Sequence, residues 1–294
     1  MKIDIAIAGF QKAGTTSISN YLGCHDEIQT HPQREMTYFS LKEEFELGEN
    51  AAQQRYFPKI KQGKKLLIKH ATLHRYEDSI RRLYENNPAC KIIVCLRNPA
   101  ERAYSSYLME KANGTKLKDF HTTIIEAFQN HNNGKDDWNY NVFIKLGEYV
   151  KYIPQLLKYF SANQVYFIRI EKFNKDSFNN MNRLCDWLGI AHLPPETTNK
   201  KYNSFKVERN KTLTRMLKIL LSKKSWVKRI GKKIIPSNKH YLFSEKLDNI
   251  SMKKGTKEIM NPETRIFLDK HFIPLENQLN ELLQKEFKEL PALF

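Results

Sequence analysis

The chain has 294 residues, 40% of them hydrophobic, which suffices for one large folded domain or two small ones and argues against intrinsic disorder. Its 49 Lys and Arg outnumber 32 Asp and Glu, so the formal net charge is +17. Such a surface attracts anions, which include nucleic acid, anionic lipid, acidic glycan and nucleotide. The charge alone does not choose among these partners.

The cysteines and the N-terminus indicate a reduced protein without a membrane span. Cys24, Cys90, Cys95 and Cys185 lack the C-x-x-C spacing of zinc sites, so we predict that all four are reduced core residues. The first ten residues, MKIDIAIAGF, are too weakly apolar for a signal peptide, and no window of 18 apolar residues predicts a spanning helix. We therefore expect a cytoplasmic protein.

Taken in chain order, short apolar runs alternate with helical patterns. Four runs predict strands, at residues 3–9, 65–70, 91–97 and 165–170. Amphipathic spacing predicts helices at residues 15–23, 76–88, 99–112 and 144–160. The alternation predicts an α/β fold with a P-loop-like central parallel sheet flanked by helices. Ligands of such sheets bind beyond the carboxyl ends of the strands.

The C-terminal third contains a segment of different composition. Residues 201–240 hold thirteen Lys or Arg and one acid, Glu208, with apolar residues spaced as on an amphipathic helix. We interpret 201–245 as a basic, helical insertion within a single domain that covers residues 1–294. It is either a solvated helical face or a surface that contacts an anionic polymer or a membrane. A closing helix or helix pair is predicted from Asn261 and Pro262 onward.

The stretch AGFQKAGTTS resembles a Walker loop that has lost its usual lysine. Two glycines keep the Walker spacing, but Thr15 stands where the lysine belongs and Lys12 lies inside the loop. Backbone N–H groups at a strand–helix turn, together with Lys12 and the hydroxyls of Thr15 and Thr16, are suited to a tetrahedral anion. The displaced lysine argues against ordinary ATP hydrolysis. A plain tight turn with a solvated lysine is the alternative.

The stretch CLRNPAERAYSSY predicts a second anion site. Asn98 caps a helix whose first residue is Pro99, which leaves Arg97 at the carboxyl end of the preceding strand. Ser105 follows two turns along that helix. An arginine fork and a hydroxyl suit a phosphate, although a structural salt bridge of Arg97 to an acid is the alternative.

Together the two motifs resemble those of the sulfotransferases that use 3'-phosphoadenosine 5'-phosphosulfate (PAPS). GFQKAGTTS is similar to the 5'-phosphosulfate loop of that family, and RNPAERAYSSY to its 3'-phosphate motif, with Arg97 and Ser105 at the matching positions. The resemblance covers most of the chain and is weakest across 201–245. It is closest to the glycosaminoglycan N- and O-sulfotransferases, because Glu35 precedes the aromatic pair Tyr38 and Phe39.

The resemblance implies a metal-free, in-line transfer of the sulfuryl group from PAPS to a hydroxyl or amine, which leaves adenosine 3',5'-bisphosphate (PAP). It implies that the donor is bound by Gln11, Lys12, Ala13, Gly14, Thr15, Thr16, Ser17, Arg97 and Ser105. Lys254, Gly255 and Thr256 match a lysine–glycine loop that closes on the donor in this family.

Glu35 is expected to be the general base and Lys12 the cation on the departing oxygens. A structural role for Glu35, as a cap or as a partner of Arg34, is the alternative. His70 is a rival base, since small-molecule sulfotransferases place a histidine two residues after a lysine; here His70 follows Lys69 directly. Lys69 and His70 are also expected to line the acceptor site.

The resemblance favours a bacterial, cytoplasmic enzyme that sulfates a carbohydrate, either a glycan or a glycolipid. A lipid or small-molecule alcohol or phenol is the alternative acceptor. A P-loop nucleotide kinase and a basic polyanion-binding protein are more distant alternatives. Nucleic acid is not expected as a partner, because the aromatic residues are not interleaved with the basic ones as in a stacking platform.

Overall fold

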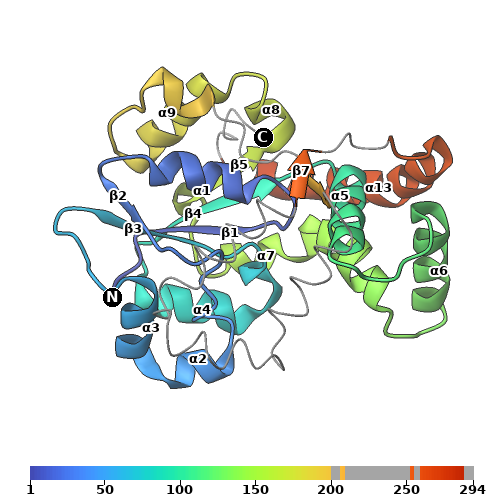
Figure 1. Cartoon of the computed structure of the whole chain (residues 1–294), viewed down its shortest axis with the longest axis horizontal. Coiled ribbons are helices and arrows are strands. Elements are labelled where there is room, and N and C mark those ends of the chain that lie inside the picture. The colour runs from blue at the N-terminus through green and yellow to red at the C-terminus, as the bar shows by residue number, and fades with distance from the viewer. Residues whose placement is uncertain (200–205, 209–251, 255–258, 288–294) are drawn as a thin grey trace. The chain divides into compact units, whose positions relative to one another are not determined.

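The structure, a computed structural model of the chain, describes residues 1–199, 206–208, 252–254 and 259–287 (Figure 1). The chain divides into two compact units: residues 1–31, 35–202 and 259–294 form the first, and residues 32–34 and 203–258 the second. In the second unit, β6 (Lys206–Glu208) pairs antiparallel with β7 (Met252–Lys254). Apart from β6, the expected basic insertion lies outside the described residues, and so do Gly255 and Thr256.

A five-stranded parallel sheet forms the centre of the first unit, with strand order β2-β3-β1-β4-β5. Its strands are β1 (Ile5–Gly9), β2 (Ile28–Thr30), β3 (Lys65–Lys69), β4 (Lys91–Leu96) and β5 (Val165–Arg169). The four predicted strands are confirmed. The sequence missed β2, because three residues with the sequence IQT give no apolar run.

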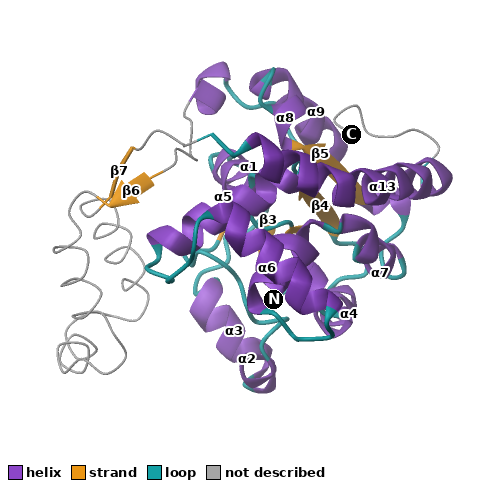
Figure 2. Cartoon of the chain, turned by 90° about the vertical axis from the view of Figure 1, so that its right-hand side faces the viewer, coloured by secondary structure: helices purple, strands orange, loops and turns teal. Residues whose placement is uncertain are grey.

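Helices cover both faces of this sheet, which confirms the predicted fold class. In Figure 1, α1, α8 and α9 lie on one side of the sheet and α4 and α7 on the other. The helices are α1 (Thr15–Gly23), α2 (Lys42–Glu46), α3 (Gly48–Tyr56), α4 (Glu77–Asn86), α5 (Pro99–Ala112), α6 (Phe120–Asn132), α7 (Ile153–Leu157), α8 (Ile170–Phe173), α9 (Ser177–Leu188) and α13 (Pro262–Glu286). Helix α13 packs against α5 and α6 (Figure 2).

Short helical turns complete the fold: η1 (Leu73–Arg75), the π-helix η2 (Tyr140–Ile144), η3 (Lys145–Gly147), η4 (Tyr149–Lys151), η5 (Ala162–Gln164) and η6 (Pro195–Asn199). The single helix predicted over 144–160 is therefore wrong, since this stretch is broken into η3, η4 and α7. Pro154 cannot donate a helical hydrogen bond to the turn before it. The backbone at Glu148, with ψ 62°, also leaves the helical region.

The core is built around β1, which is buried at every position. Because helices cover both faces, the strands are continuous apolar runs rather than alternating ones. Each fully buried isoleucine of β1 contributes about 1.5–3 kcal/mol of transfer free energy. Cys90, Cys95 and Cys185 are buried as expected, but Cys24 is exposed after the end of α1, so its assignment to the core was wrong.

The predicted helix caps are confirmed. Asn98 accepts a hydrogen bond from Glu101 N at 3.1 Å at the start of α5, and Pro99 is the first helical residue. Asn261 accepts one from Glu263 N at 2.8 Å at the start of α13. The closing segment is one helix of 25 residues rather than a pair. Within the described ranges, no helix is long and apolar enough to cross a membrane.

Gly14 provides a test of how the loop before α1 is packed. Its φ of +90° disfavours other residues, and a Cβ there would lie 2.5 Å from Ile170 Cδ1. Gly63, with φ +77°, has nothing within 4 Å of such a Cβ. We expect Gly63→Ala to lower the free energy of unfolding by about 1–2 kcal/mol through its backbone alone. Gly14→Ala should lower the free energy of unfolding by about 1–3 kcal/mol more than this, because the added methyl group overpacks against Ile170.

Urea unfolding of both variants measures this difference. Equal losses in the two variants would show that the contact with Ile170 does not constrain the loop.

Candidate active site

The candidate site lies where three neighbouring parallel strands end. β1 is flanked by β3 on one side and by β4 on the other, so their carboxyl ends share one edge of the sheet. The chain between β1 and α1, the residues after β3 and Arg97 after β4 all leave the sheet at this edge. This is the edge at which open α/β sheets bind ligands.

The loop between β1 and α1 presents the uncapped N-terminus of α1. Gly14 is the N-cap residue, and no side chain caps the helix. The first N–H groups of a helix have no intrahelical acceptor, and the helix dipole adds partial positive charge there. The loop is held by Ala13 N, which donates to Phe10 O at 3.1 Å, and by Phe10 N, which donates to Cys95 O at 2.8 Å. The turn therefore suits an anion.

Lys12 and Arg97 join the loop to the end of β4. Arg97 Nη1 donates to Lys12 O at 3.3 Å, and Lys12 Nζ lies 3.6 Å from Met109 Sδ on α5. Lys12 itself has φ +69°, which turns its backbone into the left-handed region. The two predicted anion motifs thus meet in the structure.

The end of β4 fixes Arg97 through several contacts. Tyr149 OH donates to Arg97 O at 2.8 Å, and Arg97 Nη2 lies 3.3 Å from Glu101 Oε2. The structural salt bridge that we considered as an alternative therefore exists, yet the Arg97 side chain remains 24% exposed and can reach a ligand. Ser105 is half-buried two turns along α5, as expected.

Glu35 is connected to the anion loop through a buried lysine. Its Oε1 lies 2.7 Å from Lys69 Nζ, and its Oε2 accepts a hydrogen bond from Ala71 N at 2.9 Å. Lys69 Nζ donates in turn to Thr16 Oγ1, at 3.4 Å, in the first turn of α1. The Lys69 side chain is only 7% exposed, whereas Glu35 is 29% exposed. Lys69 therefore connects the partly exposed carboxylate of Glu35 to the start of α1, which follows the anion loop.

His70 lies beside the same carboxylate. Its Nδ1 is 3.9 Å from Glu35 Oε2, and its backbone N donates to Ile7 O at 3.0 Å. Burial lowers the pKa of His70, and the Glu35 carboxylate opposes this only in part. The histidine is therefore neutral near pH 7. Its position fits a residue that lines the site.

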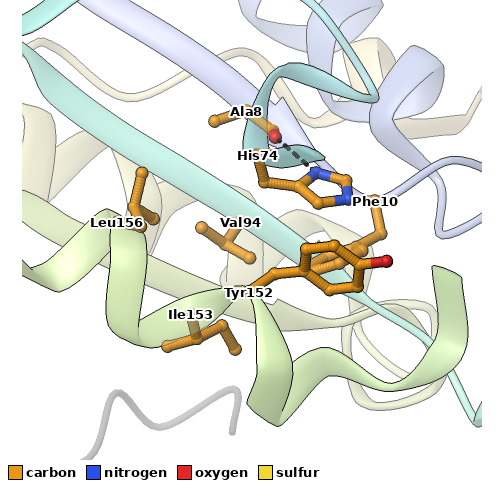
Figure 3. A pocket seen from close by; sticks show the side chains of 7 residues that line it. All are labelled: Ala8, Phe10, His74, Val94, Tyr152, Ile153 and Leu156. Carbon is orange, nitrogen blue, oxygen red and sulfur yellow. Dashed lines mark hydrogen bonds between the residues drawn. The ribbon is translucent and has the colours of Figure 1, made fainter. Parts of the chain in front are cut away.

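His74 has a structural role beneath the loop. Its Nδ1 donates to Ala8 O at 3.1 Å, and its ring packs against Phe10 and Tyr152 (Figure 3). These side chains line a narrow apolar pocket that has no space for a water molecule. Burial, in the first place, lowers the pKa of His74 to about 3. This pocket is a packing feature rather than the binding site.

The structure brings most of the predicted site residues to one edge of the sheet. The exceptions are Gly255 and Thr256, which lie outside the described residues, and Lys254, whose side chain is not described. The sequence missed the contacts of Glu101 and Tyr149 with Arg97. For Glu101 a signal was present, because it stands in the first turn of the helix that begins two residues after Arg97. Across residues 1–199 and 259–287, no cluster of His, Cys, Asp or Glu is placed to hold a metal ion.

The fold and the two joined anion motifs define a P-loop-like enzyme domain. A model of the sulfotransferase domain family matches residues 2–258, and the chain therefore belongs to that family, which places it among the transferases. The predicted resemblance is thus confirmed at the level of the family.

Relatives named as sulfotransferases agree with this assignment, and a solved structure shares the fold. The chain is 26% identical to human heparan sulfate glucosamine 3-O-sulfotransferase 6 over 187 residues. The match covers 64% of this chain and 52% of that protein. It is 24% identical to a Caenorhabditis briggsae bifunctional heparan sulfate N-deacetylase/N-sulfotransferase 1, over 66% of this chain and 23% of that protein. The chain thus spans about half or less of these relatives. A sulfotransferase structure from Alicyclobacillus acidocaldarius shares the fold, with a TM-score of 0.65, 19% identity and 98% coverage of both chains.

The low pKa of His74 gives the stability of the protein a defined pH dependence. Histidine in the unfolded chain titrates near pH 6.5. Between pH 6.5 and 3, His74 is therefore protonated in the unfolded chain but stays neutral in the native protein. Stability is therefore lost as the pH falls, by about 2 kcal/mol between pH 6.5 and pH 5 from this group. His74→Asn keeps a donor for Ala8 O and removes the titration.

We expect the unfolding free energy of His74→Asn to fall less steeply over this range than that of the wild type, as measured by urea unfolding at each pH. Parallel pH profiles for the two proteins would contradict the burial of a neutral His74.

Proposed function

We propose that the protein transfers the sulfuryl group of PAPS to a hydroxyl or amine of a carbohydrate acceptor. The connection from Glu35 through Lys69 to Thr16 carries the proposal, because it joins a solvent-accessible carboxylate to an anion-binding loop. PAPS would supply an activated sulfonate and a bisphosphate leaving group. The two joined anion motifs fit a donor with separate 5' and 3' anionic groups.

The loop binds the 5' end of the donor, and the residues after β4 bind its 3' end. Residues Gln11 to Ser17 offer N–H groups and hydroxyls to the 5' end, and Lys12 places a cation beside the departing oxygens. Arg97 and Ser105 are suited to the 3'-phosphate, since a guanidinium fork binds phosphate through parallel hydrogen bonds. Lys254, Gly255 and Thr256 stay part of the proposed donor site by family resemblance. The proposed transfer itself requires no metal.

Glu35 acts as the general base in this proposal. Its carboxylate accepts the proton from the acceptor O–H or N–H while the acceptor atom forms its bond to sulfur and the bridging oxygen leaves with the nucleotide. Lys69 and Ala71 N hold the carboxylate in place, and lone pairs remain for the incoming proton. Neutral His70 and Lys69 border the acceptor.

The carbohydrate acceptor rests on the relatives, which include heparan sulfate sulfotransferases and a mouse carbohydrate sulfotransferase 15. A panel of glycans, glycolipids, phenols and lipids assayed with labelled PAPS identifies the acceptor. We further propose that residues 1–294 form one sulfotransferase domain with 201–245 inside it, which the span of the family match supports.

Glu35→Gln tests the assignment of the base. We expect kcat to fall by about 100-fold to 10,000-fold, the usual contribution of a positioned base. The affinity for PAP should change little, because Glu35 contacts Lys69 and Ala71 rather than the N–H groups of the loop. Steady-state kinetics on the best acceptor of the panel, together with calorimetry of PAP, give both quantities.

Two further variants complete this experiment. Glu77→Gln removes the ion pair between Glu77 of α4 and Lys158 at the end of α7, and should leave kcat unchanged. His70→Ala should retain more activity than Glu35→Gln. Full turnover by Glu35→Gln together with loss of activity in His70→Ala would transfer the role of base to the histidine.

A further inference from the structure

Arg97 shares its carboxylate partner with a second arginine. Glu101 Oε2 lies 3.3 Å from Arg97 Nη2, and Glu101 Oε1 lies 3.4 Å from Arg265 Nη1. Arg97 follows β4, whereas Arg265 belongs to α13, near the other end of the chain. Glu101 therefore bridges two guanidinium groups that come from distant parts of the sequence.

Glu101 stands next to the groups proposed to bind the 3'-phosphate. Because α5 begins at Pro99, Glu101 and Ser105 lie one turn apart on the same face of that helix. A carboxylate in this place competes with phosphate for Arg97 and repels it as a like charge. The three charged side chains are 24–37% exposed, so solvent screens these interactions only in part.

Helix α13 holds Arg265 in a fixed position. Arg265 Nε lies 2.7 Å from Asp269 Oδ2 one turn further along the helix. The helix itself is fastened to the sheet region by two more polar contacts: His271 Nε2 lies 2.9 Å from the buried Glu148, and Glu276 lies 2.5 Å from Arg169 at the end of β5. Contacts within the protein thus place the guanidinium beside Glu101, which lowers the entropic cost of using it.

We infer that Arg265 is a positioning residue of the donor site, which neutralises Glu101 and thereby leaves the Arg97 fork available to the 3'-phosphate. This inference rests on the proposed PAPS donor. Without Arg265, the charge of Glu101 is less compensated and acts more strongly on Arg97 and on the phosphate, so binding of a 3'-phosphorylated nucleotide weakens. A nucleotide without that phosphate is unaffected.

Calorimetry with PAP and with adenosine 5'-monophosphate tests this role at low ionic strength. We expect Arg265→Gln to raise the Kd of PAP by about threefold to tenfold and to leave that of the monophosphate unchanged. Arg265→Lys, which keeps the charge, should bind PAP nearly as the wild type does. Glu101→Gln should bind PAP at least as tightly as the wild type. When Arg265→Gln is added to Glu101→Gln, the affinity for PAP should fall by less than about twofold.

Arg81→Gln is the matched control. Arg81 has a similar exposure, 43%, and pairs with Glu85 and Asp78 on α4, so the variant should bind both nucleotides normally. A merely structural Arg265 would lower Tm and leave both Kd values unchanged, and this result would overturn the inference. Equal weakening of both nucleotides, or an equal loss with and without Glu101, would overturn it as well. Failure of the wild type to bind PAP would instead contradict the proposed donor.

Discussion

The ion pair between Lys69 and Glu35 is the interaction on which the candidate site depends. Lys69 ends a buried strand with its side chain almost fully covered, and a buried cation without a partner is strongly unfavourable. Glu35 supplies that partner, and the same ammonium reaches Thr16 on α1. Removal of Glu35 would leave the buried ammonium of Lys69 without its ionic partner, which is unfavourable, so the pairing fixes the carboxylate relative to the loop.

The second constraint is the fixed carboxyl end of β1. Both neighbouring strands hold it: His70 N donates to Ile7 O and His74 to Ala8 O on the β3 side, and Phe10 N donates to Cys95 O on the β4 side. A loop anchored on both sides keeps its N–H groups oriented before a ligand arrives. Preorganised donors of this kind stabilise developing charge without reorganisation during the reaction. The anchored strand end and the uncapped helix start thus both keep N–H groups oriented toward an anion.

The sequence was sufficient for the parts of the fold that depend on local pattern. Short apolar runs located four strands, and Asn98 with Pro99 located the start of α5 within a residue. The helical pattern over 144–160 failed because tertiary packing and Pro154 favour short turns there. The three-residue β2 had no pattern of its own and is a strand only because it pairs with β3.

The sequence singled out residues that the fold gathers at one sheet edge, but it did not predict the contacts between them. Lys12, Glu35, Lys69 and Arg97 stand in recognisable motifs, yet the contact of Glu35 with Lys69 requires β3 to lie directly beside β2, which the sequence did not predict, and strand order is not encoded in any single segment. The bridge from Glu101 to Arg265 is more remote still, because it depends on the packing of α13 against α5. Long-range pairings of this kind follow from the assembled fold.

Titration calorimetry with PAP in EDTA, compared with ATP in the presence of Mg²⁺, tests the central claim most directly. A site built from an uncapped helix start, Lys12 and Arg97 for a doubly phosphorylated adenosine should bind PAP tightly without divalent metal and ATP with Mg²⁺ far more weakly. Tight, Mg²⁺-dependent binding of ATP with no binding of PAP would contradict the account and favour a nucleotide kinase.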